Sequence, residues 1–248
     1  MQRPDYIASD VHLGAVPRET EQAFLAFLDH VGAHARTLLL AGDLFDFWFE
    51  WGPVVPGKHF RVLSALAELV DAGIPVTLLG GNHDAWGGRF LREEVGVAFH
   101  PDPVRLELGG RQALVAHGDG VGRGDLRYRM LKAVIRSRAA IVAFRTLHPE
   151  LGVRLARAVS ATEAKGGDLD AASGRARYIA EWAHGVPRAG PELGLVVCGH
   201  AHLPVIDEVE PGRYYVNTGD WIRHFSYVTV RPGSPPELHR WDRHAARP

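Results

Sequence analysis

Short apolar runs that stop at a polar residue recur along the chain. They occupy residues 6–9, 38–40, 76–79, 113–116 and 195–198. Runs of this length, bounded by turn-forming residues, predict strands that are buried on both faces. The side chains that could bind a ligand and follow these runs most closely are Asp10, Asp43, Asn82, His117 and His200. Because open α/β sheets place their ligands at the carboxyl ends of strands, these side chains are candidates for function.

Two amphipathic helices are predicted between the first three strands. One follows Pro17 and continues through Phe24, Phe27 and Val31 with helical spacing. The other spans 58–71 and ends before Gly73. Strand, helix, strand, helix, strand is the pattern of a parallel sheet.

The later strands alternate between apolar and polar residues. Residues 104–108 and 111–116 flank Gly109-Gly110 and predict a hairpin. Residues 204–209, 213–216 and 225–230 alternate as well. We therefore predict a layered α/β core with a second, partly antiparallel sheet.

Between 122 and 188 the strand pattern disappears and helical spacing takes over. One helix is predicted from the apolar residues between Leu126 and Val142, and another after Pro149. This segment has 13 basic and six acidic residues, so its net charge is +7, whereas the rest of the chain carries −8. It could be a solvated helical face, or a cap that offers cations to phosphates or to an anionic membrane. We predict a core of 1–121 and 189–248 with a basic helical cap insertion at 122–188.

Composition narrows the class of protein. The chain has 248 residues, 46% of them hydrophobic, and a net charge of −1, so no global signal for nucleic-acid binding is present. Its single cysteine, Cys198, excludes an intramolecular disulfide and sits in an apolar run, as a buried inert thiol would. No apolar signal region opens the sequence, and no apolar stretch reaches the roughly 18 residues of a membrane span. We expect a cytoplasmic protein.

Carboxylates, an amide and imidazoles at five strand ends favour a metal site. Any one of them could be a turn former, a helix cap or a core histidine, but five such ends in one chain are hard to explain by turn chemistry. Cleavage of a phosphate ester by two metals needs a bridging anion with further ligands on either side. Asp43 is the candidate bridge. One metal would take Asp10, His12 and His202, and the other would take Asn82, His117 and His200.

The same residues carry a resemblance. The ordered segments are Asp10-Val11-His12, Gly42-Asp43, Gly81-Asn82-His83-Asp84, His117-Gly118-Asp119 and Gly199-His200-Ala201-His202. Together they resemble the signature of calcineurin-like metallophosphoesterases. The resemblance implies a four-layer αββα sandwich and a dinuclear centre of Mn²⁺, Fe or Zn²⁺, for which we expect Mn²⁺.

A narrower resemblance covers nearly the whole chain. The chain is similar to the UDP-2,3-diacylglucosamine diphosphatase family in four segments. They are residues 9–14, the aromatic run 45–51, residues 117–120 with Asp125 and Tyr128, and residues 217–221. That family also carries a basic helical insertion. The resemblance implies cleavage of a lipid-linked UDP to UMP and an acylated sugar 1-phosphate in lipid A biosynthesis, at the cytoplasmic face of the inner membrane.

Two residues beside the candidate ligands are predicted to act in catalysis. Many members of the narrower family have arginine in place of His83, and arginine would mainly clamp a phosphate, whereas histidine could also transfer a proton. Asp84 could orient His83 or merely cap a helix.

A second set of residues is predicted to bind the substrate. Asp125 and Tyr128 would meet the sugar or uridine. Basic residues of the cap would meet phosphates or the bilayer: Arg127, Arg154, Arg157 and Lys165. The aromatic run 45–51 could wall an apolar pocket or simply pack the core.

Three functions are compatible with the pattern. They are a peripheral-membrane pyrophosphatase for a UDP-linked acyl sugar, a soluble phosphoesterase for another phosphodiester or nucleotide, and a scaffold with a degenerate site. The scaffold is disfavoured because no candidate ligand position holds an apolar residue. The basic amphipathic insertion and the aromatic run favour the first.

Overall fold

The fold is described from a computed structural model of the chain. It covers residues 2–121, 126–164, 169–190 and 192–244, without the side chains of 126–127, 157–164, 169–173 and 187–189. The strands are β1 (Asp5–Ala8), β2 (Thr37–Leu40), β3 (Val76–Leu79), β4 (Ala98–His100), β5 (Val104–Leu108), β6 (Arg111–Val115), β7 (Leu195–Cys198), β8 (Val205–Glu210), β9 (Arg213–Asn217), β10 (Ser226–Val230) and β11 (Glu237–Arg240). The helices are α1 (Arg18–His34), α2 (Phe60–Asp71), α3 (Arg89–Glu93), α4 (Leu126–Ile135), α5 (Arg138–Arg145), α6 (Pro149–Ala164) and α7 (Leu169–Ala189), with a 3₁₀ turn, η1, at Gly57–His59.

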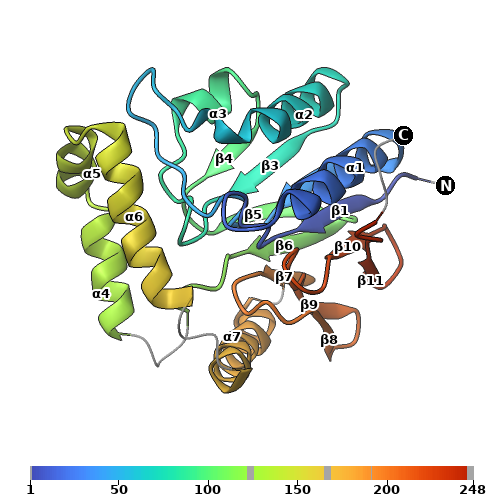
Figure 1. Ribbon diagram of the computed structural model, residues 1–248. Helices are drawn as coiled ribbons and strands as arrows, with labels where there is room; N and C mark the ends of the chain where they lie inside the picture. Colours follow the sequence, from blue (N-terminus) through green and yellow to red (C-terminus); the bar gives the residue numbers. More distant parts are fainter. Residues whose placement is uncertain (1, 122–125, 165–168, 191, 245–248) are drawn as a thin grey trace.

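Two sheets form the centre of the molecule (Figure 1). The first has the order β11-β10-β1-β2-β3-β4, in which β1 to β4 are parallel. The second has the order β5-β6-β7-β9-β8, in which β6, β7 and β9 are parallel. Apolar side chains from both sheets, including Ile7, Leu39, Val115 and Val197, share one buried cluster, so the sheets pack face to face.

Helices cover the outer faces of both sheets. The α1 residues Phe24, Phe27 and Leu28 are buried against the first sheet, as their helical spacing requires. On the second sheet, Ile179 and Ala183 of α7 are buried in a separate cluster with residues of β7 and β9. The order helix, sheet, sheet, helix confirms the predicted αββα sandwich.

The helices α4, α5 and α6 stand beside the sandwich rather than on a sheet face (Figure 1). The single helix predicted from Leu126 to Val142 is two helices, because Ser137 starts a new one: its Oγ accepts a hydrogen bond from the Ala140 N–H at 3.2 Å. The predicted cap range 122–188 also contains all but the last residue of α7, which is the fourth layer of the sandwich. In the part of the chain that the structure describes, no helix is long and apolar enough to cross a membrane.

Most predicted strands and helices are present. Residues 225–230 do form a strand, but β10 joins the first sheet, antiparallel to β1, instead of extending the second. The short elements β4, α3 and β11 were not predicted, because three to five residues carry too little periodicity.

Candidate dinuclear metal centre

All seven predicted ligands lie on the loops that leave the carboxyl ends of five strands. Strands β1, β2 and β3 of the first sheet lead to Asp10 and His12, to Asp43 and to Asn82, respectively. Strands β6 and β7 of the second sheet lead to His117 and to the pair His200 and His202. The strands within each set are parallel, so the loops gather at one edge of the sandwich.

The backbone at this edge is strained where the candidate ligands sit. Among the described residues, six that are not glycine have a positive φ, and five of these are predicted ligands. They are Asp10 (54°), His12 (53°), Asp43 (52°), His200 (63°) and His202 (58°), and the sixth is Phe225. Such left-handed residues cost roughly 1–2 kcal/mol each and persist only where surrounding contacts hold them. Their concentration here marks a built site.

One cluster joins Asp10, His12 and His202. The His202 Nε2 atom lies 3.3 Å from Asp10 Oδ1 and 3.3 Å from His12 Nε2. His12 Nε2 is 3.9 Å from the same carboxylate oxygen. These three side chains could hold one metal ion between them.

A second cluster joins Asp43, Asn82, His117 and His200. His117 Nε2 lies 3.1 Å from Asp43 Oδ2 and 3.2 Å from Asn82 Oδ1. The ring of His200 stands edge-on to that of His117, with 5.2 Å between centroids, and Asp43, His117 and His200 could hold a second ion. Carboxylate, amide oxygen and imidazole are donors that suit divalent metals of intermediate hardness, so the residues fit the group that the signature implies.

Asp43 lies between the two clusters. Its Oδ2 atom faces His117 Nε2 on one side and lies 3.9 Å from His12 Nε2 on the other. Its Oδ1 atom accepts a hydrogen bond from the His83 backbone N–H at 2.9 Å. One carboxylate therefore reaches both groups of candidate ligands.

Glycines allow these loops to approach so closely. A Cβ atom added to Gly81 would overlap Asp43 Oδ1 and come within 2.6 Å of the Asp43 backbone nitrogen. A Cβ atom on Gly42, whose φ is +100°, would overlap His117 Nδ1. Both positions have no space for a side chain.

Burial and neighbouring charges shift the pKa values of the carboxylates and imidazoles in the centre. Burial alone would raise the pKa of Asp43, but the imidazoles of His117, His83 and His12 hold it well below the ordinary value. For Asp10, burial again opposes ionisation and His202 outweighs it, so its pKa falls to about 2. Burial acts against protonation of His117, yet Asp43 raises its pKa to about 10. Two buried carboxylates that stay ionised create the negative potential that cations would neutralise.

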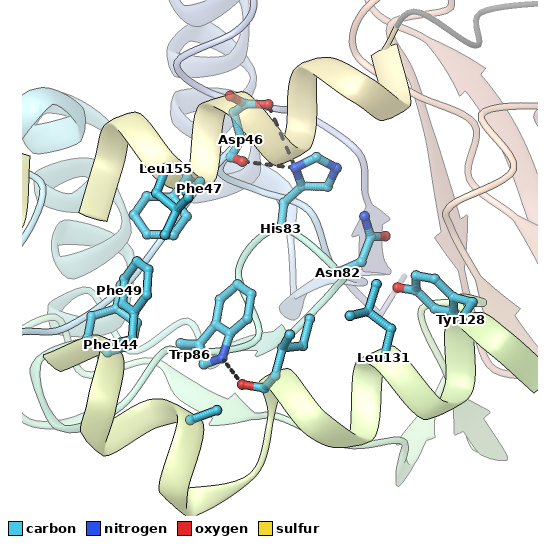
Figure 2. A pocket seen from close by; sticks show the side chains of 13 residues that line it. Asp46, Phe47, Phe49, Asn82, His83, Trp86, Tyr128, Leu131, Phe144 and Leu155 are labelled. Carbon is cyan, nitrogen blue, oxygen red and sulfur yellow. Dashed lines mark hydrogen bonds and ion pairs between the residues drawn. The ribbon is translucent and has the colours of Figure 1, made fainter. Parts of the chain in front are cut away.

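His83 lies beside the centre and is oriented by Asp46. Its Nδ1 atom is 2.9 Å from the Asp46 carbonyl oxygen and 3.7 Å from Asp46 Oδ1 (Figure 2). If Nδ1–H donates to the carbonyl, Nε2 is the ring nitrogen that remains to act at the metal centre. The ring also stands edge-on to His12, and His83 could join His12 and Asp43 around an ion.

Asp84 contacts the backbone of the loops beside the centre. Its carboxylate accepts backbone N–H groups of Gly81 at 2.8 Å, and of Asp43 and Phe45 at 3.2 Å each. Burial, followed by the charge of Asp43, raises the pKa of Asp84 to about 6. The residue ties together the two loops that bear Asp43 and Asn82.

Supporting residues that the sequence did not single out stand behind the candidate ligands. The Ala41 carbonyl lies 2.9 Å from His117 Nδ1. Asp220 Oδ2 lies 3.6 Å from His202 Nδ1, and Ser9 Oγ donates to Asp10. Ser9 and Asp220 lie within the segments that carried the narrower resemblance, but only the fold brings residue 220 to residue 202.

A cavity of about 270 Å³ opens beside His83 and Asn82 (Figure 2). The helices α4, α5 and α6 and the aromatic run form its walls. Its apolar lining includes Phe47, Phe49, Trp86, Leu131, Phe144 and Leu155. In Figure 2, Phe47, Phe49 and Phe144 gather at the end away from Asn82. The aromatic run thus does both things considered above: Phe47 and Phe49 line the cavity, while Trp48 is fully buried.

The predicted substrate-binding residues are only partly gathered here. Tyr128 lines the cavity, and its hydroxyl donates to Asp119 Oδ2 at 3.0 Å. Arg154 is exposed and pairs with Glu150 at 2.8 Å on the same helix. Asp125 and Lys165 lie outside the described residues, as do the side chains of Arg127 and Arg157.

Comparison with known proteins identifies the family of the chain. The sequence pattern of calcineurin-like phosphoesterases matches residues 6–204, which include every candidate ligand. The chain belongs to the calcineurin-like phosphoesterase family.

Relatives and a solved structure extend the comparison. The UDP-2,3-diacylglucosamine hydrolase of Porphyromonas gingivalis is 30% identical over 92% of this chain and 94% of its own length. The enzyme of that name from Ralstonia nicotianae is 31% identical over 88% of this chain and 84% of its own length. A hypothetical protein of Pyrococcus horikoshii, at 10% identity, superimposes with a TM-score of 0.50 over 96% of this chain and 88% of its own, and shares the fold.

Proposed function

We propose that this phosphoesterase is a metal-dependent hydrolase that cleaves the pyrophosphate of a UDP-linked diacylglucosamine in lipid A biosynthesis. Water would add at one phosphorus of the diphosphate, and the products would be UMP and the acylated sugar 1-phosphate. Relatives named UDP-2,3-diacylglucosamine hydrolase, which align over most of the chain, support this assignment. The observation that carries it is the apolar cavity that opens beside Asn82 and His83.

An apolar cavity next to a charged centre suits a substrate with both kinds of group. The diphosphate must reach the buried metal ligands, while the acyl chains must avoid water. Each buried CH₂ contributes about 0.8 kcal/mol, so the aromatic and aliphatic lining would add strongly to binding of an acyl chain. A nucleotide or a small phosphodiester would leave that surface unused.

The two clusters are proposed as the sites of two divalent cations, with Mn²⁺ the expected metal. Asp10, His12 and His202 would bind one ion, and Asn82, His117 and His200 the other. Asp43 would be shared, since its carboxylate reaches both clusters. When bound, the ions would neutralise the charge on the phosphoryl oxygens and activate a water molecule.

The remaining groups have roles that follow from their contacts. With Nδ1–H held by the Asp46 carbonyl, a protonated His83 would carry its second proton on Nε2, give that proton to the departing phosphate and become a neutral imidazole. Asp84 would act through the backbone, because its carboxylate fixes the loops of Asp43 and Gly81. Tyr128 would contact the substrate from α4.

The outer face of the cap is proposed to meet the inner membrane. Apolar side chains on α4 to α6 are exposed, among them Met130 (63%), Val134 (62%) and Val142 (60%). Exposed arginines, Arg145 and Arg154, lie on α5 and α6. Cations near an anionic surface contribute about 1 kcal/mol each, and the apolar side chains can enter the interface. The protein would then be peripheral on the cytoplasmic leaflet, with its cavity close to the source of the lipid substrate.

The experiment is a substrate panel with Mn²⁺. UDP-2,3-diacylglucosamine in mixed micelles would be compared with UDP-N-acetylglucosamine, a dinucleotide and bis(p-nitrophenyl) phosphate. We expect kcat/KM to be highest for the acylated substrate and to fall sharply when the acyl chains are removed. A preference for the dinucleotide, or equal rates with and without acyl chains, would assign the chain to another substrate of the family.

A further inference from the structure

Three polar side chains, two on one face of α4 and one directly after its last residue, meet the loops of the candidate metal centre. Tyr128, Lys132 and Arg136 are four residues apart, so they follow one another along a single face of the α4 segment. None of them is a candidate metal ligand. Their common partner is Asp119, which lies two residues after His117. Asp119 is only 5% exposed.

All three side chains approach the same atom, Asp119 Oδ2. The Tyr128 hydroxyl donates to it at 3.0 Å, and the Lys132 Nζ atom lies 2.7 Å away. Lys132 also donates to the Asp119 carbonyl at 3.1 Å. An Arg136 Nη2 atom lies 3.6 Å from the same carboxylate oxygen. The pair with Lys132 is mostly shielded, since the side chains are 24% and 3% exposed, so water screens it less than a surface pair.

Arg136 extends the contact to the other sheet. It donates to the carbonyl of Gly81 at 2.9 Å and to that of Pro101 at 2.9 Å. Gly81 belongs to the loop after β3, whereas Asp119 belongs to the loop after β6. One helix is thus tied to two loops that bear candidate ligands, Asn82 on the first and His117 on the second.

The same helix supplies a wall of the cavity. Leu131 and Ile135 line it, and the Ile135 carbonyl accepts a hydrogen bond from Trp86 Nε1 at 3.3 Å (Figure 2). Among the described side chains of this helix, Met130 and Val134 are exposed and contribute little apolar burial to fixing its register. The polar face is therefore what sets the position of the cavity relative to the metal centre.

We propose that Asp119 and Lys132 form a latch that positions α4 over the centre and so determines binding of the acylated substrate. They are positioning residues, which act through the wall of the cavity rather than on the reacting atoms. The proposal rests on the proposed function for the identity of that substrate, but not for the latch itself.

Lys132→Met tests the latch because it removes the charge and keeps much of the side chain's length. We expect KM for UDP-2,3-diacylglucosamine to rise about tenfold, as loss of a charge-assisted bond predicts. We expect kcat for that substrate, kcat/KM for bis(p-nitrophenyl) phosphate and the metal content to stay at wild-type values. Lys132→Arg should restore KM. Arg138→Met is the matched control, since it removes the same charge from an exposed position on α5.

A double-mutant cycle with Asp119→Asn separates a latch from two independent effects. We expect the pair of substitutions to raise KM no further than Lys132→Met alone. Additive effects, or an equal loss of activity on both substrates with metals retained, would overturn the proposal.

Hydrogen exchange gives a readout that needs no substrate. Lys132→Met should speed amide exchange in 128–136 and leave α1 unchanged, whereas Arg138→Met should change neither. Unchanged exchange in 128–136 would overturn the latch even if the acylated substrate were cleaved. Faster exchange in a protein that ignores the acylated substrate would keep the latch and reject the proposed function.

Discussion

Gly81 leaves no space for a side chain beside the proposed bridging carboxylate. Gly81→Ala would place a methyl group over Asp43 Oδ1, so the carboxylate would have to move away from His117. We expect the variant to lose at least one metal equivalent and most of its activity, measured by elemental analysis and aryl diester hydrolysis. Gly57→Ala is the control, because its Cβ atom would have nothing within 4 Å. Full metal content in Gly81→Ala would show that the carboxylate is not confined as described.

His83 tests whether proton transfer can be separated from metal binding. In His83→Gln the side chain can still accept or donate hydrogen bonds but cannot protonate a leaving group. We expect kcat to fall by about 10²–10⁴-fold while both metals remain bound. Loss of a metal would instead make His83 a ligand beside His12 and Asp43, which the geometry also permits.

At the scale of elements, the position of α6 depends on a glycine in its interior. A Cβ atom on Gly152 would come within 2.6 Å of Trp51 Cζ2 and 3.1 Å of Phe144 Cζ, at the aromatic end of the cavity. Gly152→Val should push the helix outward, raise KM for the acylated substrate and alter its preference for acyl length. A series of substrates with different chain lengths would measure this, and an unchanged length profile would contradict it.

Gly185→Ala is the matched control on α7. Its Cβ atom would meet nothing within 4 Å, and alanine is a better helix former than glycine. We expect it to raise the free energy of unfolding by about 0.5–1 kcal/mol without changing KM. Thermal denaturation of the two variants would separate an effect on packing from one on helix propensity.

The parallel strands and their loops were predictable because the buried runs and the ligand-type residues are local signals. The seven candidate ligands fell at one edge because parallel strands share a direction. The contact between His83 and Asp46 was not predictable, because Asp46 lies 37 residues away and contributes mainly its backbone carbonyl. From the sequence, Asp84 could cap a helix or orient His83, and only the fold shows that its oxygens accept backbone N–H groups.

The extent of the cap could likewise be defined only from the structure. Its charge and helical spacing were visible in sequence, but helical spacing alone did not distinguish the layer α7 from the helices that wall the cavity. The range 122–188 therefore stays a prediction for the domain boundary. We propose that the functional cap is the part that contains α4 to α6.

At the scale of the molecule, metal binding should stabilise the fold. The ionised carboxylates of Asp10 and Asp43 lie almost fully buried, and cations would bind only to the folded arrangement. At a metal concentration a hundredfold above Kd, we expect each occupied site to raise the free energy of unfolding by about 2.7 kcal/mol. Melting temperatures with and without a chelator would measure it, and an unchanged value would contradict a bound metal in the native protein.

The pH dependence of metal binding has a definite sign. Asp43 raises the pKa of His117 to about 10 in the metal-free protein, so its imidazole is protonated at neutral pH. A metal must displace that proton, so affinity should rise with pH, by up to about tenfold per unit for one released proton between about pH 6 and about pH 8. Calorimetric titration in two buffers of different ionisation enthalpy would count the released protons. Affinity that is independent of pH would contradict binding at His117.

The most direct test is a titration of metal-free protein with Mn²⁺ in which the products from UDP-2,3-diacylglucosamine are identified by mass spectrometry. We expect no cleavage without metal, a rate that rises until two equivalents are bound, and UMP in amounts equal to the acylated sugar 1-phosphate. Release of UDP, activity without metal, or a maximum at one equivalent would contradict a dinuclear centre that cleaves the pyrophosphate.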